Sequence, residues 1–440
     1  MTKYLPLVFA LALACTKTEQ ADQKAVQNGP PEGQCPGDNG GITLPAGFCA
    51  TVFADTVGHA RDIVVATNGD VYVNTWSGEY YPLKGPPAGG FLIAMRDTKH
   101  TGKADSIVRF GPTPATKGTG GTGIALYKGY LYAEAGPTIV RYKLPAGQLV
   151  PDTTSAEVIV SDMPIDGDHP MHPFVIDTSG ALYTDVGSAS NSCQLKNRTL
   201  NSPGHKPCTE LERRAGVWKF DANKPNQHFS PTARYVTGLR NGVGIAIASD
   251  GSVWSTQHGR DQLGENFPKL YTLVQSSDLP AEELMHLTAN ADFGWPECYY
   301  DQNQKKLVLA PEYGGDGGKA VGVCAKKVAP DVAFPGHWAP DGLVFYSGTM
   351  FPAHYQSGAF IAFHGSWDRP IGGQQGYKVV FQPFANGTPS APYETFADGF
   401  AGAIVAPDKA AHRPVGLAVA PDGSLFMTED WNGRIWRVTH

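Results

Sequence analysis

Residues 415–428, VGLAVAPDGSLFMT, form an apolar strand, a turn that ends at Gly423 and a second apolar strand. The same pattern recurs at residues 62–75 (DIVVATNGDVYVNT), 173–186 (PFVIDTSGALYTDV) and 243–256 (VGIAIASDGSVWST), with looser copies at 121–134 and 341–354. Such β units cannot bury their apolar faces alone, and radial stacking into a propeller is the usual solution. The sequence therefore predicts an all-β, six-bladed β-propeller.

The spacing between successive turn glycines is irregular, which predicts long inserted loops on one face of the ring. Inserted loops commonly carry function. The largest insertion, roughly residues 262–335, is expected to cover that face. We expect the early strand GFCATVFA, residues 47–54, to pair with the last blade and close the ring.

The composition is that of a large globular protein. The 440 residues are 41% hydrophobic and 17% charged, with a formal net charge of -6, which provides for a large core. This balance lacks the excess of Lys and Arg that a nucleic-acid surface requires. No nucleic-acid partner is expected.

The first residues are typical of a targeting segment. Residues 1–15, MTKYLPLVFALALAC, have one lysine, a short apolar run and small residues before Cys15, which indicates a signal peptide. Simple cleavage is one interpretation, and a lipobox that leaves an acylated, membrane-anchored Cys15 is the favoured one. Residues 16–34 are polar and read as a flexible tether, followed by a propeller domain at 35–440. We expect an exported bacterial protein, either a periplasmic or a cell-surface lipoprotein.

Six cysteines remain beyond Cys15, an even number typical of disulfides in an exported chain. Fifteen connectivities are possible. Closeness in sequence favours the pairs Cys35–Cys49, Cys193–Cys208 and Cys298–Cys324. The chain has no CxxC spacing, which makes a cysteine metal site the weaker interpretation.

Polar residues recur at one phase of the repeat. Ten or eleven residues before five of the turn glycines stand His59; His169; Arg240 and Asn241; His337 and Trp338; and His412 and Arg413. Only the second unit differs, with Gly118 and Thr119 at this phase. Equivalent positions of a propeller face the same rim of the central channel, so this pattern predicts an anion-binding rim.

Three of these residues are candidates for a catalytic or ligand-binding role. His169 is a candidate general base, since a neutral imidazole can accept a proton near pH 7, and His172 competes for that role. Arg240 beside Asn241 suits a flat ligand rich in carbonyl or carboxylate groups. The plainer alternatives are a loop histidine bonded to a carbonyl and a surface arginine in a turn.

Two further segments have the composition or spacing of a ligand site. Residues 256–266, TQHGRDQLGEN, have the Gly, acidic and amide composition of a calcium loop without EF-hand spacing, and an ordinary polar loop fits equally well. Residues 118–123, GTGGTG, fit GxGxxG but lead into a β unit. The dinucleotide interpretation therefore fails, because that motif requires a following helix.

A set of short motifs in a specific order points to a family. These are GLRN (238–241), HG-x5-EN (258–266), FGWP (293–296), FHGSWDR (363–369), GYKV (376–379), HRPVGLAVAPDG (412–423) and NGRIWRV (432–438). With them, residues 44–440 resemble the pyrroloquinoline quinone (PQQ)-dependent glucose/sorbosone dehydrogenase family, soluble quinoprotein aldose sugar dehydrogenases. The GSW sequence favours its sorbosone dehydrogenase branch.

The resemblance implies a role for each matched residue. It places the catalytic base on His169 and the contacts to the reacting quinone carbonyls on Arg240 and Asn241. Arg413 would bind a cofactor carboxylate, and Trp367 and Arg369 would reach the cofactor from the fifth blade. The backbone carbonyls of Gly259 and Arg260 would hold calcium.

The implied function is oxidation of an aldose or a sugar aldehyde such as L-sorbosone, with an electron acceptor that is a cytochrome or a quinone. Three departures stand out: Arg260 replaces a proline, Ser188 replaces an acid, and the family's fifth-blade lysine has no clear equivalent. A calcium-dependent sugar-lactone hydrolase and a non-catalytic propeller that binds carbohydrate or protein remain the alternatives.

Overall fold

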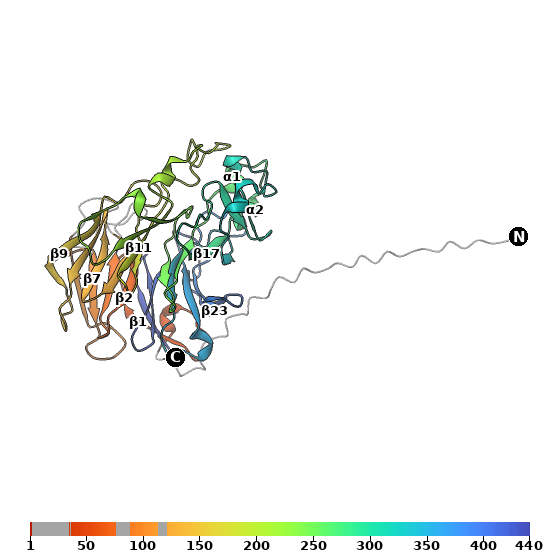
Figure 1. The fold of residues 1–440 in the computed structure, drawn as a ribbon. Helices are drawn as coiled ribbons and strands as arrows, with labels where there is room; N and C mark the ends of the chain where they lie inside the picture. Colours follow the sequence, from red (N-terminus) through yellow and green to blue (C-terminus); the bar gives the residue numbers. More distant parts are fainter. Residues whose placement is uncertain (2–34, 36, 76–88, 113–120) are drawn as a thin grey trace.

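The computed structural model of the chain describes residues 1, 35, 37–75, 89–112 and 121–440 (Figure 1). Apart from Met1, the predicted signal segment with Cys15 and the tether at 16–34 lie outside the described residues. So do Gly118 and Thr119 of the second repeat unit.

Within the described residues, the strands form six sheets of four or five strands and one two-stranded hairpin. The first three blades contain β2 (Ala60–Val65), β3 (Val71–Thr75), β4 (Leu92–Arg96) and β5 (Ser106–Phe110); β6 (Ile124–Tyr127), β7 (Tyr130–Ala135), β8 (Thr138–Lys143), β9 (Asp152–Ser161) and β13 (Gln227–His228); and β10 (Phe174–Ile176), β11 (Ala181–Val186), β12 (Gly216–Asp221) and β14 (Arg234–Thr237). The last three contain β15 (Ile245–Ile247), β16 (Val253–Gln257), β17 (Glu282–Leu287) and β20 (Val332–Phe334); β21 (Pro340–Phe345), β22 (Gly358–Phe363), β23 (Lys378–Ala385), β24 (Thr388–Pro389) and β25 (Glu394–Ala397); and β26 (Pro414–Val419), β27 (Leu425–Glu429), β28 (Ile435–Thr439) and β1 (Cys49–Ala54).

The six blades form a closed ring. Their innermost strands contact one another in the circle β2, β6, β10, β15, β21, β26 and back to β2. The first strand, β1, completes the last blade by pairing antiparallel with β28, from Cys49 opposite Thr439 to Ala54 opposite Ile435. The predicted six-bladed propeller and its closure by the N-terminal strand are both confirmed.

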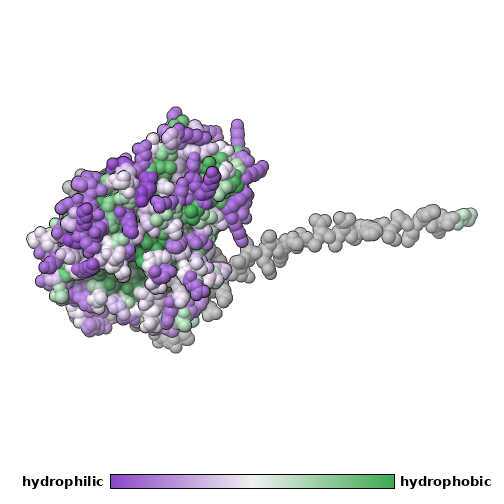
Figure 2. All heavy atoms as spheres, viewed as in Figure 1, coloured by the Kyte–Doolittle hydropathy of each residue, from purple (hydrophilic) through white to green (hydrophobic). Residues whose placement is uncertain are grey.

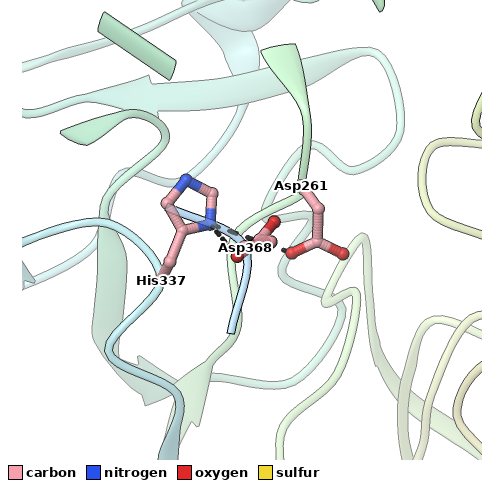
Figure 3. Close-up of side chains that lie close together, drawn as sticks. All are labelled: Asp261, His337 and Asp368. Carbon is pink, nitrogen blue, oxygen red and sulfur yellow. Dashed lines mark ion pairs between the residues drawn. The ribbon is translucent and has the colours of Figure 1, made fainter. Parts of the chain in front are cut away.

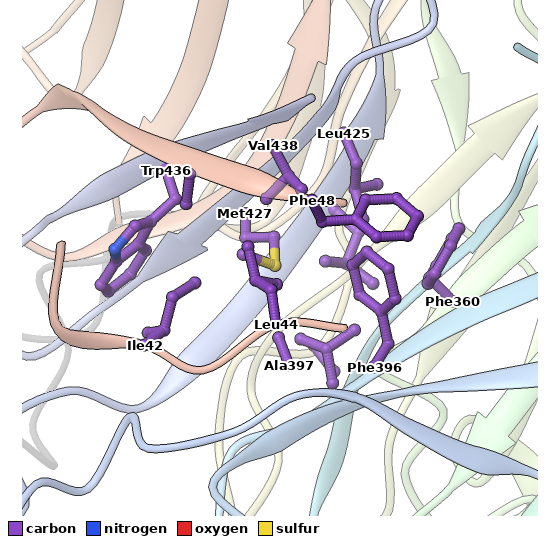
Figure 4. Packing of buried hydrophobic residues seen from close by; sticks show 14 of the residues in the cluster. Ile42, Leu44, Phe48, Phe360, Phe396, Ala397, Leu425, Met427, Trp436 and Val438 are labelled. Atoms are coloured by element: carbon purple, nitrogen blue, oxygen red, sulfur yellow. The ribbon is translucent and has the colours of Figure 1, made fainter. Parts of the chain in front are cut away.

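Apolar side chains seal this closure. Phe48, beside β1, packs edge-on against Phe351 and Phe396 of the fifth-blade region, and Trp436 of β28 is fully buried (Figure 4). Burial of large aromatic side chains of this kind dominates core energetics. The last blade is therefore held to its neighbour through side chains that come from both ends of the chain.

The turn glycines behave as predicted in five of the six units. Gly69, Gly129, Gly180, Gly251 and Gly423 all have positive φ, which glycine adopts without strain. The fifth unit is different, because its two inner strands are joined by residues 346–357 with a 3-10 helix at Ala353–Tyr355. The expected second strand at residues 349–354 is therefore wrong, since Pro352 has no N–H for a central strand and the chain turns there instead.

The long insertion lies above one end of the blades in Figure 1, where α1 (Leu263–Asn266) and α2 (Leu273–Asp278) stand over the strand ends. It also holds the hairpin β18 (Cys298–Asp301) and β19 (Lys306–Leu309), and the outer strands β17 and β20 of the fourth blade fall within the same residue range. The remaining short 3-10 helices are Asn39–Gly41, Thr209–Glu212, Pro231–Ala233, Pro311–Tyr313 and Gly322–Lys326.

The face of the molecule drawn in Figure 2 is mostly hydrophilic. No helix among the described residues is long and apolar enough to span a membrane. Green spheres gather over the region of α1 and α2 in this view. In that segment Leu270, Leu273 and Val274 are exposed. Single exposed apolar residues are normal on soluble proteins, so this grouping carries no conclusion by itself.

Three disulfides join the predicted pairs, Cys35–Cys49, Cys193–Cys208 and Cys298–Cys324. Closeness in sequence was therefore the correct guide. Disulfides of this number are typical of proteins that fold in an oxidising compartment.

The Cys298–Cys324 disulfide should stabilise the inserted region at residues 262–335. It closes a loop with a sequence separation of 26, and loop-closure entropy predicts a stabilisation of roughly 3 kcal/mol. Replacing both cysteines with serine should lower the free energy of unfolding by this amount in urea denaturation. An unchanged midpoint under non-reducing conditions would contradict the prediction.

Candidate functional site

A cavity of about 670 Å³ lies at one end of the ring. Its lining includes six of the predicted site residues, namely His169, Arg240, Asn241, Gly259, Trp367 and Arg413. Within the described part of the chain, the lining does not include Arg260 or Arg369. A cavity of this size is typical of sites for small molecules and cofactors.

The propeller geometry explains why these residues meet. His169 and Arg240 lie in the loops before β10 and β15, and Arg413 directly precedes β26. Because the next strand of each blade runs antiparallel, the residues that follow it return to the same end of the ring. Asp261 after β16 and Asp368 after β22 reach the cavity in this way.

The cationic rim predicted from the repeat phase is only part of the lining. Arginines 61, 198, 240 and 413 line the described cavity together with six carboxylates, those of Asp168, Asp261, Glu282, Asp341, Asp368 and Asp408. Two of the acids, Asp261 and Asp368, follow the second strand of a blade, which a count upstream from the turn glycine does not reach. Of the six, Asp261 stands ten residues after the turn glycine Gly251, so a forward count would have found it.

Not every residue at the predicted phase faces the cavity. His59 bonds the carbonyl of Asp430 through Nδ1 at 2.6 Å, Trp338 packs in the hydrophobic core, and His412 packs edge-on against Trp436. Of the described residues at this phase, His337 does line the cavity, beside those already named. The repeat phase was therefore a useful but incomplete guide.

His169 has the arrangement of a general base. Its Nδ1 lies 2.8 Å from the carbonyl oxygen of Ser188 and 3.0 Å from the Ser188 hydroxyl oxygen. Nδ1–H donating to the carbonyl leaves the lone pair on Nε2. Burial, reinforced by the charge of Arg240, holds the pKa of His169 well below the ordinary 6.5. The side chain is therefore neutral at pH 7.

A glycine makes room for this histidine. A Cβ on Gly187 would lie 2.6 Å from the Cβ of His169, so any side chain there would displace the imidazole. His172 has no such freedom, since Nδ1 lies 3.0 Å from Glu134 Oε1 and Nε2 lies 2.9 Å from the Pro164 carbonyl. The geometry favours His169 over His172 as the base.

Arg240 is buried, with its guanidinium fixed on several sides. Nη1 donates to the Gly259 carbonyl at 2.9 Å, Nε donates to the Asn191 carbonyl at 2.9 Å, and Nη2 donates to Asp261 Oδ2 at 3.0 Å. Arg198 shares the same Asp261 oxygen at 2.9 Å. Asn241 follows Arg240 at the wall, and its carbonyl accepts a hydrogen bond from the backbone N–H of His258. This network orients Arg240 before any ligand arrives.

Arg413 is held differently. Its Nε donates to the His364 carbonyl at 3.1 Å, its Nη2 donates to the Gly365 carbonyl at 2.7 Å, and its guanidinium lies over the Tyr377 ring. These bonds go to neutral groups, so they leave the positive charge available to an anionic ligand. Trp367 is 52% exposed at the wall, with the guanidinium of Arg198 5.8 Å from its ring centre.

The guanidinium groups of Arg369 and Arg260 form ion pairs with residues outside the cavity lining. Arg369 donates to Asp278 Oδ1 at 3.0 Å and to the Gly336 carbonyl at 3.1 Å, which ties α2 to the fifth blade. Arg260 donates to Glu312 Oε1 at 2.5 Å. The sequence resemblance did not show where these two side chains go.

A second group of charges forms the floor of the cavity. Arg61 Nη1 lies 2.6 Å from Asp430 Oδ2 and 3.2 Å from Asp341 Oδ2, and His258 Nε2 lies 3.0 Å from Asp341 Oδ1. Burial alone would raise the pKa of Asp341, but Arg61 and His364 outweigh it and hold this pKa below its ordinary value. The floor is therefore a balanced ionic network that connects the first, fourth, fifth and sixth blades.

Beside Arg240, three potential metal ligands come together. One ligand atom each from Asp261, His337 and Asp368 all lie within 4.8 Å of one another (Figure 3). Burial and the nearby charge of Asp261 raise the pKa of Asp368. The fifth-blade segment thus contributes the carboxylate of Asp368 to the cavity. The family resemblance implies a lysine in this segment.

The comparisons with known proteins agree with this architecture. The TrAA12-like family matches residues 42–440. The chain belongs to this TrAA12-like family. The sorbosone branch favoured by the sequence stays a prediction, because the match is to this family description and does not separate branches.

Other relatives show the same fold. Calcium and iodide structures of a Trichoderma reesei Carbohydrate-Active Enzymes Family AA12 protein are 20% identical, with a TM-score of 0.71, and cover 91% of this chain and 97% of theirs. The holo PQQ domain of a Coprinopsis cinerea pyranose dehydrogenase is also 20% identical, with a TM-score of 0.70, and covers 94% and 100%. A PQQ-bound aldose sugar dehydrogenase from Streptomyces coelicolor is 14% identical, with a TM-score of 0.54 and coverages of 90% and 99%.

One curated relative, an uncharacterized protein of Borreliella burgdorferi, is 32% identical over 211 residues, 46% of this chain. The match spans 47%, or about half, of that protein's length.

Proposed function

We propose that this TrAA12-like protein is a PQQ-dependent sugar dehydrogenase, a quinoprotein oxidoreductase that oxidises an aldose or a sugar aldehyde such as L-sorbosone. The observation that carries the proposal is the placement of His169, a neutral base with a lone pair on Nε2, in one cavity with Arg240 and Arg413. Family membership and the PQQ-containing structural relatives support it.

The lining fits a flat tricarboxylate quinone. Arg413 offers a guanidinium whose bonds go to backbone carbonyls, which suits an added carboxylate. Arg240 and Asn241 would meet the carbonyl side of the ring system, and Trp367 offers an aromatic face at the wall. When bound, the quinone would accept a hydride from the sugar carbon.

His169 would perform the proton step of this reaction. Nε2 would take the proton of the sugar hydroxyl, while the bond from Nδ1–H to the Ser188 carbonyl stabilises the resulting imidazolium. Arg240 keeps its orientation through Asp261 and Asn191 and would stabilise negative charge that develops beside it.

A divalent cation would bind at the Asp261 and Asp368 carboxylates, not at the two backbone carbonyls. The family resemblance implies calcium on the carbonyls of Gly259 and Arg260, but the Gly259 carbonyl already accepts from the cationic Arg240. Asp261 and Asp368 lie close by and offer carboxylate oxygens, which suit a divalent cation. The carboxylate group therefore fits a cation better than the two carbonyls do.

Export and electron transfer complete the proposal. The three disulfides support export to an oxidising compartment, either periplasmic or extracellular. Acylation of Cys15 would anchor the protein to a membrane, and a cytochrome or a quinone would remove the electrons.

A hydrolase is the second candidate, since the grouping of Asp261, His337 and Asp368 is also what a metal-dependent sugar lactonase needs. Hydrolysis of sugar lactones with a metal ion alone, without PQQ, would favour that activity. A protein with neither activity that still binds sugars would match the non-catalytic alternative.

The test is PQQ binding by the purified protein, followed by dye reduction across aldoses and sorbosone. Wild type should bind PQQ at micromolar concentration or better and reduce the dye. Arg413→Ala should weaken PQQ binding by roughly 10–100-fold, the loss of a charged hydrogen bond.

Arg437→Ala is the matched control for this test. Arg437 lies on β28 and pairs with Asp422 at the surface, away from the cavity lining, so PQQ affinity should stay unchanged. A wild-type protein that does not bind PQQ would rule out the redox function.

A further inference from the structure

Asp368 is a buried carboxylate that makes no hydrogen bond within the described part of the chain. Its side chain is only 5% exposed, and among the described residues neither carboxylate oxygen has a hydrogen-bond partner. Burying an ionised carboxylate without compensation is costly, so such groups are usually paired or bound to a metal. These oxygens lie in the cluster with Asp261 and His337 (Figure 3).

The Nδ1 atom of His337 faces this carboxylate. Nε2 of the same ring lies 2.8 Å from the Ser276 carbonyl and donates its proton there, so Nδ1 is the ring nitrogen left to bind a metal ion. Nδ1 lies 3.4 Å from Asp368 Oδ1 and 3.8 Å from Asp261 Oδ1. These contacts are ion pairs when Nδ1 is protonated, and a metal ion that displaced this proton would meet one nitrogen and two carboxylate ligands.

The backbone holds His337 in place for this arrangement. Its φ is 68° and that of Ala339, two residues on, is 60°, a left-handed conformation that non-glycine residues seldom adopt. Residues in strained conformations cluster at functional sites, where the surrounding structure keeps them. The carbonyl on Nε2 further fixes the ring, as is usual for metal-ligating histidines.

We propose that Asp261, His337 and Asp368 bind a divalent first-row metal ion of the zinc or manganese class. The ligand set decides the class, because calcium takes oxygen ligands whereas imidazole nitrogen with carboxylates suits zinc and manganese. The site is distinct from the pair of backbone carbonyls at Gly259 and Arg260. It rests on the part of the proposed function that moves the cation to Asp261 and Asp368, and it names the metal class from the side-chain geometry.

The experiment uses the full purified protein, stripped with a chelator and kept free of PQQ. Zinc, manganese and calcium are titrated separately by calorimetry, and bound metal is counted by elemental analysis after dialysis. We expect one equivalent of zinc or manganese, bound at least about 10-fold more tightly than calcium. Cobalt should give visible absorption bands that report nitrogen and oxygen ligands.

Two near-isosteric variants test the ligands. Asp368→Asn and His337→Gln should each weaken zinc or manganese binding by about 100-fold or more and abolish the cobalt bands, since each removes a direct ligand. Asp408→Asn is the control, because Asp408 also lines the cavity but is not part of the cluster. Its metal affinity should stay within about 3-fold of wild type.

Several results would overturn the proposal. These are the absence of stoichiometric binding, binding that survives both ligand variants, and calcium binding that is preferred and insensitive to His337→Gln. Circular dichroism of each variant shows whether it is folded, and the cobalt spectrum of wild type is decisive even if a variant is not. PQQ binding is measured separately, so failure of the metal site and failure of the redox function give different results.

Discussion

Replacing His169 with Gln should lower turnover with PQQ and a sugar substrate by roughly 10²–10⁴-fold, the usual contribution of a positioned general base. The amide keeps a polar group near Ser188 but cannot accept the hydroxyl proton. The binding of PQQ itself should change little. Steady-state dye reduction and PQQ titration together measure the two effects.

The pH profile provides an independent check on His169. Its pKa lies well below 6.5 because of burial and the charge of Arg240, so the base is deprotonated throughout the neutral range. The rate should therefore stay constant as pH falls to 6.5 and decline only below it, when Nε2 becomes protonated. A decline in rate centred above pH 6.5 would show that a group other than His169 causes the loss of activity at low pH.

His172→Gln is the matched control. Both ring nitrogens of His172 are engaged, by Glu134 and by the Pro164 carbonyl. Its replacement should lower stability and leave turnover of the folded enzyme nearly unchanged. The reverse result, with turnover lost at His172 and kept at His169, would transfer the role of base to His172.

Replacing Arg240 with Met should destabilise the protein by about 3–5 kcal/mol, the usual effect of removing one member of a buried ion pair. Arg240 is 3% exposed. Its guanidinium neutralises the charge of Asp261 and donates hydrogen bonds to Asn191 and the Gly259 carbonyl. Met fills similar space but leaves those acceptors unsatisfied. Urea denaturation of the PQQ-free protein measures the loss.

Arg413→Met is the comparison for this prediction. Arg413 is also buried, but its hydrogen bonds go to the carbonyls of His364 and Gly365, so its removal should cost only about 1–3 kcal/mol. Equal losses in both variants would show that the Asp261 pair contributes little. Arg198, which shares Asp261, would then be the residue that compensates it.

Much of the fold could be predicted because the repeat is a local signal. Apolar strands joined by a glycine turn fixed the number of blades, and the pairing of β1 with the last blade followed from an unpaired early strand. The fifth unit failed because residues 346–357 contain a glycine at Gly348 without a tight turn. A glycine can adopt positive or negative φ, so its presence in the sequence does not by itself predict a tight turn.

The candidate site was predicted in part for a similar reason. His169, Arg240 and Arg413 precede inner strands and were reached by counting back from the turn glycines. Asp261 and Asp368 follow second strands, and their meeting with His337 depends on how neighbouring blades pack. The directions taken by Arg260 and Arg369 depend on Glu312 and Asp278, which are distant in sequence and carried no signal.

The pairing of β1 with β28 also sets an order of events during synthesis of the chain. The last blade needs residues 49–54 and 435–439 together, and the floor of the cavity needs Arg61 to meet Asp430. Neither exists on a nascent chain whose final residues have not emerged. The cavity can therefore be completed only after the whole chain has been made.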